Sequence, residues 1–328
     1  MKIVALNFGR IHQQTQDFLE VAIQAATEKG ADVELIQMVN KKIERCKGCG
    51  ACSGGVKRRT SDAPFCVIKD DLREIVEKCL DADALLVACP VYVLAPPGQF
   101  FDFVHRFGVA ADKAVMVLRE EQRKRDGYRS IDQRFLKKQW VGFISVGGCP
   151  FHHWVSFGLP SMNTLAFPTT MKVVGAVDIH GVRGSEERRE LFSKQCKALG
   201  ENLVASVGKQ DEEVKWAGRK GFCPACHGDI FRVIPRTTKL ECPICGITGE
   251  LMIHEDGQPE VVFTDDAIFH SRMNSGGVID HCVELHGNEE YCMELYGDKT
   301  WVTPRVFQKG SAANQSDKTV LKEERANG

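Results

Sequence analysis

Apolar runs alternate with amphipathic stretches over the first two thirds of the chain. Unbroken apolar runs are typical of strands buried on both faces of a sheet, and segments with a 3.6-residue period predict helices between them. Strand–helix–strand units of this length predict a parallel, doubly wound α/β sheet. The predicted strands span residues 2–7, 32–38, 84–89, 140–146 and 171–179, and the predicted helices span 15–29, 70–80, 100–107 and 185–207.

The first predicted helix has clear signals at both ends. Thr15 is a good N-cap, Asp17 and Glu20 follow in the first turn, and Gly30 is the expected C-terminal cap. The loop before this helix would offer free N–H groups to an anion such as a flavin phosphate, aided by Arg10 and Thr15. The alternative is a plain strand-to-helix turn. The candidate loop residues are Phe8, Gly9, Arg10, His12, Gln13, Gln14 and Thr15.

Composition narrows the possible classes of protein. The chain has 328 residues, 43% of them hydrophobic and 27% charged, as expected for a globular protein of one or two domains. A net charge of −1 gives no global attraction for nucleic acid or an anionic membrane. The N-terminus does not resemble a signal peptide, and no apolar run approaches the about 20 residues that span a bilayer. Fourteen cysteines therefore indicate metal ligands in a reducing, cytoplasmic setting.

Three cysteines with two residues between neighbours follow the second predicted strand. Cys46, Cys49 and Cys52, joined by Cys66 after thirteen further residues, fit the pattern that holds an iron–sulfur cube. Gly48 and Gly50 would permit tight turns with positive φ between the ligands. Zinc sites more often use two separated cysteine pairs, so we predict a 4Fe–4S cluster. A zinc knuckle and a set of reduced structural thiols are the alternatives.

A proline-rich turn follows the third predicted strand and would hold a flat aromatic ligand. Its motif, Pro90-Val91-Tyr92 followed by Gly98-Gln99, Phe103 and Arg106, resembles the flavin loop of flavodoxin-like reductases. Together with the cysteine triplet, it makes residues 1–208 similar to the iron–sulfur flavoprotein family, within the NADPH-dependent FMN reductase superfamily.

The resemblance implies a five-stranded sheet of order 2-1-3-4-5, with FMN at its carboxyl edge. It also implies ferredoxin or NAD(P)H as electron donor, a small-molecule or protein acceptor, and a homodimer or homotetramer. The loops after strands one, three and four would bind FMN. Beyond the first loop, the implied flavin contacts are Pro90, Val91, Tyr92, Val93, Leu94, Gly147, Gly148 and Cys149.

Two neighbouring histidines follow the fourth predicted strand. His152 and His153 are candidates for proton donation to substrate or flavin, although such a pair is more often structural. The basic stretch within residues 109–139 predicts a solvated helix, with a cationic lid or subunit contact as the alternative.

Four further cysteines form a strong metal-binding signal near residue 230. Two Cys-x2-Cys pairs separated by fifteen residues predict a tetrahedral ribbon site. The pattern resembles both a zinc ribbon and a rubredoxin-like module; we favour zinc, with a mononuclear iron as the alternative, since both accept four thiolates. Nucleic-acid binding is not expected, because dense basic and aromatic flanks are absent. The predicted ligands are Cys223, Cys226, Cys242 and Cys245.

These patterns divide the chain into five predicted parts and support one function. We predict a flavin and iron–sulfur domain (1–208), a linker (209–219), a ribbon (220–255), a β-rich extension (256–309) and a disordered tail (310–328). Pairing FMN with a cluster suits an oxidoreductase that converts electron pairs into single-electron flow. The alternative is a redox- or metal-sensing module, or an interaction module, without enzymatic turnover.

Overall fold

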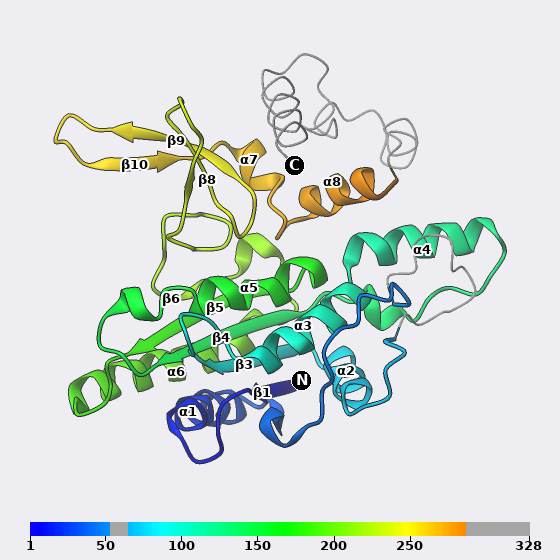
Figure 1. The fold of residues 1–328 in the computed structure, drawn as a ribbon, viewed down its shortest axis with the longest axis horizontal. Helices are drawn as coiled ribbons and strands as arrows, with labels where there is room; N and C mark the ends of the chain where they lie inside the picture. Colours follow the sequence, from blue (N-terminus) through cyan, green and yellow to red (C-terminus); the bar gives the residue numbers. More distant parts are fainter. Residues whose placement is uncertain (53–64, 287–328) are drawn as a thin grey trace, which may run out of the picture.

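A computed structural model describes residues 1–52 and 65–286 of the chain. Its main sheet is parallel, with strand order β2-β1-β3-β4-β5-β6 (Figure 1). The predicted five-stranded order is confirmed, and a short sixth strand extends one edge. The strands are β1 (Lys2–Asn7), β2 (Asp32–Gln37), β3 (Ala84–Pro90), β4 (Trp140–Gly147), β5 (Lys172–His180) and β6 (Ala217–Gly218).

Helices cover both faces of this sheet, as a doubly wound fold requires. α1 (Gln14–Glu28) and α6 (Glu186–Ser206) pack on one face, which alternate strand residues such as Ile3 and Leu86 line. α2 (Leu72–Asp81), α3 (Gly98–Ala110) and α5 (Gly158–Thr169) pack on the other, around Phe143. Short 3-10 helices are η1 (Met38–Asn40), η2 (Gln133–Phe135), η3 (His152–Trp154) and η4 (Asp211–Glu213). No helix of the described residues is long and apolar enough to cross a bilayer.

Helix α1 begins one residue earlier than the sequence predicts. Gln13 is the N-cap and its side chain caps nothing, so the expectation that Thr15 caps the helix is wrong. Thr15 instead lies in the first turn, buried against Gly9, where an added Cβ would come within 2.6 Å of the Thr15 Cβ. At the other end Gly30 has φ +90 and donates to the Thr27 carbonyl at 2.9 Å, which confirms the glycine cap.

The basic stretch after α3 forms helix α4 (Lys113–Arg125), which is only partly solvated. Asp112 caps its N-terminus by accepting a hydrogen bond from the Val115 N–H. Arg119, Glu120 and Arg123 are buried, so the prediction of a solvated helix is wrong for the middle of α4. One reason is that α4 packs against a C-terminal helix, through Leu118 and other apolar side chains.

The ribbon forms an antiparallel sheet of order β10-β9-β8-β7 that packs on the main domain. Its strands are β7 (Arg232–Val233), β8 (Lys239–Glu241), β9 (Thr248–Ile253) and β10 (Pro259–Val262). The yellow hairpins lie on the same side of the main sheet as α5 (Figure 1). The ribbon cysteines share one hydrophobic cluster with Met162 of α5 and with Met171. The segment predicted as a linker supplies β6, which pairs with β5, so ribbon and sheet are joined by packing as well as by chain.

The β-rich extension is confirmed only at its start. β10 pairs with β9, but the next described residues form helices α7 (Asp265–Phe269) and α8 (Ser275–His286). Thr264 caps α7 by accepting from the Ala267 N–H. Gly277 lies in α8, where a Cβ would meet the Ser271 carbonyl oxygen at 2.2 Å, so only glycine fits this close approach. The predicted disordered tail, 310–328, lies outside the described residues.

Candidate flavin and metal sites

The three loops predicted to bind FMN lie at one edge of the sheet, because β1, β3 and β4 are parallel neighbours. The loops after β3 and β4 are joined by backbone hydrogen bonds. Val91 donates its N–H to the Val146 carbonyl at 2.9 Å, and Phe157 donates to the Leu94 carbonyl at 3.2 Å. This edge is the place where open α/β sheets bind ligands.

The loop after β1 packs on the core through Phe8 and exposes its polar side chains to solvent. Phe8 is buried, with its ring centroid 5.3 Å from that of Phe100, so its side chain supports the loop from the core. Asn7 accepts the Gly9 N–H at 2.9 Å. Arg10, His12 and Gln13 are exposed at the uncapped start of α1, and Gln14 is half-buried. Exposed polar side chains and a helix N-terminus without a capping side chain together suit a phosphate.

The loop after β3 is a strained hairpin turn. Tyr92 and Ala95 exchange backbone hydrogen bonds of 2.8 and 3.3 Å, while Val93 and Leu94 at the tip have φ 50 and 73. Positive φ is rare for a β-branched residue, and such strain clusters at ligand sites. Val93 is 97% exposed and Tyr92 is exposed beside it, while Pro90 is buried as the last residue of β3. The turn therefore presents an aromatic and an aliphatic side chain at the sheet edge.

The loop after β4 adds three exposed aromatic side chains. We call Tyr92, Phe151, Trp154 and Phe157 the aromatic rim; all four are exposed. Gly147 is buried, and a Cβ there would come within 2.2 Å of Val155, so only glycine fits. Gly148 is exposed and Cys149 is half-buried next to it. Exposed apolar groups gathered in this way mark a binding surface.

The structure distinguishes the two candidate histidines. His152 Nε2 lies 3.2 Å from Asp178 Oδ2, whereas the ring of His153 contacts Phe151 and Trp154, and no carboxylate contact of His153 is found among the described residues. Burial raises the pKa of the Asp178 carboxyl, although the nearby Ser145 hydroxyl, His152 and His180 oppose the shift. A carboxylate behind an exposed imidazole orients it for proton transfer.

Asp178 and His180 were missed by sequence reasoning. Asp178 stands opposite Ser145 in the register of β4 and β5, and the His180 ring centroid lies 5.8 Å from that of His152. The available signal was the pair of polar residues two apart at the carboxyl end of an otherwise apolar strand.

The N-terminal cysteines lie on the segment between β2 and α2, where Arg106 of α3 bonds Cys66. Cys46 and Cys49 are exposed, Cys66 is half-buried and Cys52 is buried. Gly48 and Gly50 have φ +60 and +66, which confirms the positive-φ turns. These thiols do not gather as a single-ion site in the described structure, where one such group is found elsewhere. An iron–sulfur cube holds its cysteine sulfurs further apart than a single metal ion does. Four thiols that do not gather around one point are therefore still suited to a cluster.

The ribbon cysteines do gather at one point. The sulfur atoms of Cys223, Cys226, Cys242 and Cys245 are all buried and lie within 4.8 Å of one another. His227 donates its N–H to the Cys223 carbonyl and Gly246 donates to the Cys242 carbonyl, which forms the two turns. The neighbouring sulfurs and burial hold the pKa of the Cys226 thiol far above its usual range. Four buried sulfurs this close together suit a metal cation that neutralises them as thiolates, so the ribbon fits a metal-binding module.

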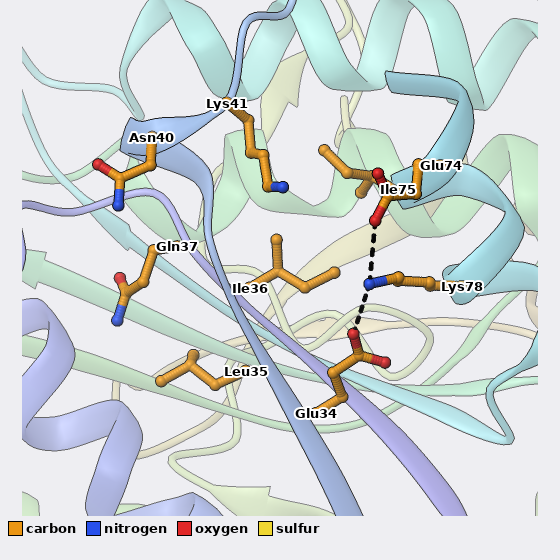
Figure 2. A pocket seen from close by; sticks show the side chains of 9 residues that line it. All are labelled: Glu34, Leu35, Ile36, Gln37, Asn40, Lys41, Glu74, Ile75 and Lys78. Carbon is orange, nitrogen blue, oxygen red and sulfur yellow. Dashed lines mark hydrogen bonds and ion pairs between the residues drawn. The ribbon is translucent and has the colours of Figure 1, made fainter. Parts of the chain in front are cut away.

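A separate pocket beside β2 and α2 is not the flavin site. It has a volume of about 250 Å3, and none of its lining residues comes from the three loops described above. Lys78 bonds Glu34 at 2.7 Å and Glu74 at 3.1 Å, so it pairs with both carboxylates (Figure 2).

Arg10→Ala is expected to weaken FMN binding about ten- to a hundred-fold. A charge-assisted hydrogen bond to a phosphate contributes about 1.5–3 kcal/mol, and about 1.4 kcal/mol is a factor of ten in Kd. Titration of the apoprotein with FMN measures the change. Arg232→Ala, which removes an arginine paired with Glu241 on the ribbon, is the matched control. An unchanged Kd in Arg10→Ala would remove the phosphate assignment.

Comparisons with known proteins agree with this geometry. Residues 1–153 match the family described as NADPH-dependent FMN reductase. Flavone synthase cfoJ of Aspergillus candidus is 25% identical over 296 residues, which are 87% of this chain and 88% of that protein. An iron–sulfur flavoprotein of Methanosarcina thermophila is 36% identical over 100 residues, 30% of this chain and just under half, 48%, of that protein. A solved structure called flavone reductase superposes with a TM-score of 0.71 at 23% identity, covering 95% and 99% of the two chains, which shows a shared fold.

Proposed function

We propose that the chain, a flavin-dependent oxidoreductase whose residues 1–153 match the NADPH-dependent FMN reductase family, transfers electrons between NAD(P)H and a flat, conjugated small molecule. The observation that carries the proposal is the sheet edge itself. Three loops converge there, and the aromatic rim stands beside one exposed histidine that is backed by a carboxylate. A flat aromatic acceptor would stack on such a rim.

The likeness to a flavone synthase supports this acceptor class. A flavone carries a carbon–carbon double bond conjugated with a carbonyl and an aryl ring. Reducing that bond requires a hydride and a proton, and forming it requires their removal. The likeness extends over 87% of this chain and therefore includes the ribbon as well as the flavin domain. We propose an enone of this type as substrate, acted on in either direction.

The chain's own residues divide the work. Gly9 to Thr15 would hold the phosphate, and the strained turn at Val93 would support the ring. Bound FMN supplies hydride chemistry between the nicotinamide and the acceptor. His152 would give the acceptor its proton or take it back, and Asp178 would hold the imidazole in place.

A second proposed activity is single-electron transfer through the cysteine loop. The likeness to an iron–sulfur flavoprotein and the set of four thiols on one loop favour it. A 4Fe–4S cluster held by Cys46, Cys49, Cys52 and Cys66 would let ferredoxin or another protein exchange electrons with the flavin site. We also propose a cytoplasmic homodimer or homotetramer, zinc in the ribbon, and the five-part division of the chain given above, with β6 in its second part and α7 and α8 in its fourth.

Anaerobic purification followed by turnover tests the proposal. The visible spectrum and metal analysis report flavin, cluster iron and ribbon metal together. NADPH or NADH is then mixed with flavone, and loss of the nicotinamide absorbance is followed with and without the acceptor. We expect acceptor-dependent oxidation. A protein that binds no FMN would overturn the flavin assignment, and a flavin-loaded protein inert toward flavone would overturn the acceptor class.

A further inference from the structure

The cysteine loop, residues 42–71 between β2 and α2, is closed at its base. The structure describes 42–52 and 65–71 of it. Lys42 and Glu44 donate their N–H groups to the carboxylates of Asp71 and Asp70, at 2.7 and 2.8 Å. Asp71 donates its N–H in return to the Lys42 carbonyl at 3.1 Å. The first and last residues of the loop are therefore hydrogen-bonded to one another.

One buried side chain of α3, Arg106, bonds both described segments of the loop and one of its cysteines. Arg106 is 1% exposed and donates to the Glu44 carbonyl at 2.8 Å, to Asp70 Oδ1 at 2.9 Å and to the Cys66 sulfur at 3.3 Å. A weaker bond reaches the Ile68 carbonyl at 3.4 Å. The guanidinium therefore directs its donors into the cysteine loop, which fixes the position of Cys66 relative to the sheet.

The charged groups beside Arg106 are compatible with a thiolate at Cys66. The Asp70 side chain is fully covered. Burial alone would raise the pKa of its carboxyl, but hydrogen bonds from Arg106 and from the Glu44 and Leu72 N–H groups hold that pKa below its usual range. Arg106 thus has one permanent anion beside it, and its Nε–H points at sulfur. A thiolate accepts such a bond more strongly than a thiol.

We propose that Arg106 is a positioning residue for the anionic cluster on this loop. Arg106 holds Cys66 as the fourth ligand by its bond to the sulfur. Its positive charge favours the more negative, reduced form of the cluster, and a hydrogen bond to ligand sulfur acts in the same direction. The inference rests on the proposed cluster and adds the residue that positions its fourth ligand.

Arginine variants purified without oxygen test the inference. Arg106→Gln removes the charge and the planar set of N–H donors, whereas Arg106→Lys keeps the charge and shows whether a loss comes from failure to fold. Arg134→Gln is the matched control, since Arg134 bonds Asp81, Glu77 and Asp132 but no cysteine. Cys52→Ala gives the iron content of the ribbon alone. The readouts are iron content, the rate at which a chelator bleaches the visible spectrum, and the reduction potential.

We expect bleaching in Arg106→Gln to be about 10- to 100-fold faster than in the wild type, the range seen when an outer-shell partner of a metal ligand is lost. Arg106→Lys should be intermediate, and Arg106→Gln should have a more negative potential because a cation beside the cluster is lost. Wild-type iron content, bleaching rate and potential in both Arg106 variants would overturn the positioning role of Arg106.

The measurements distinguish the absence of a cluster from the absence of a positioning role for arginine. If the wild type holds no more iron than Cys52→Ala, the proposed cluster and this inference both fall, while FMN-dependent turnover is measured independently. If the wild type is loaded and the arginine variants equal Arg134→Gln in every readout, only the inference falls.

Discussion

Replacing His152 by asparagine is expected to slow transfer to a conjugated enone by about 10²- to 10⁴-fold, the usual contribution of a positioned general acid. The imidazole is exposed at the loop after β4, and Asp178 Oδ2 lies 3.2 Å behind it. Asparagine keeps the size and polarity of the side chain but cannot deliver a proton. The effect should therefore fall on the step in which the acceptor is protonated.

Two acceptors separate that step from the others. The flavin is reduced anaerobically with NADPH and then mixed with flavone, which must take up a proton, or with ferricyanide, which takes up only electrons. Reoxidation by flavone should be slow in His152→Asn, and reoxidation by ferricyanide should change far less. Equal slowing with both acceptors would point to damage of the flavin site and contradict the acid role.

The ribbon supplies a matched control for His152. His254 Nε2 lies 2.6 Å from Glu260 Oε2 on the β9–β10 hairpin, so it is also an exposed histidine with a carboxylate partner. His254→Asn should react with both acceptors at the wild-type rate. A flavone rate in His152→Asn equal to that of His254→Asn would refute the assignment.

The Asp178 carboxylate gives this prediction a pH dependence. Burial raises the pKa of Asp178, against opposing contributions from Ser145, His152 and His180. As the pH falls through that raised pKa, the carboxylate takes up a proton and loses its attraction for the imidazolium. The rate of reoxidation by flavone should therefore fall as the pH is lowered through the pKa of Asp178. Asp178→Asn should be slow at every pH and should not show this fall.

Replacing Cys226 by serine is expected to remove the ribbon metal and to unfold the ribbon. Metal binding to such four-thiolate sites contributes about 10–16 kcal/mol of folding free energy in isolated zinc modules near neutral pH. The four sulfurs are buried within 4.8 Å of one another, so without a cation they repel or remain protonated. The loss should also reach the main domain, because Met162 and Met171 share the hydrophobic cluster of the ribbon cysteines.

Metal content, thermal unfolding and limited proteolysis measure this loss. We expect about one metal ion fewer per chain, a lower Tm, and rapid cleavage beyond β6. Cys196→Ser is the control, since Cys196 is a fully buried thiol of α6 outside the ribbon. Its cost should be the few kcal/mol or less of an ordinary core change. A Cys226→Ser chain that keeps its metal and its Tm would contradict the structural role of the site.

The sheet could be predicted from short windows of sequence. The apolar run at residues 2–7 became β1 with the same bounds, and the run at 84–89 became β3 with one residue added. Burial on both faces of a parallel strand demands an apolar side chain at nearly every position, so the signal is local. Strand order followed from the resemblance and from the handedness of parallel connections. Cysteine spacing likewise identified the ribbon ligands, because each pair forms one turn.

Helix ends and the C-terminal extension were less predictable. Thr15 has the chemistry of an N-cap, yet it is buried against Gly9, and Gln13 occupies the cap position. The extension was expected to be β-rich, whereas residues 265–269 and 275–286 form α7 and α8. Gly276 and Gly277 fit in α8 because the backbone of residues 269–272 approaches it too closely for a larger side chain. In each case a tertiary contact outweighed the local preference.

The roles of the polar site residues were decided by tertiary structure alone. His152 and His153 are equivalent in sequence, and only the pairing of β4 with β5 brings Asp178 to one of them. Arg106 was read as part of a flavin motif, yet it bonds Cys66, 40 residues earlier in the chain. Periodicity and ligand spacing act within a few turns of chain, so the sequence determines strands, helices and metal knuckles. A hydrogen bond between distant side chains depends on how those elements pack, and no short window of residues contains that information.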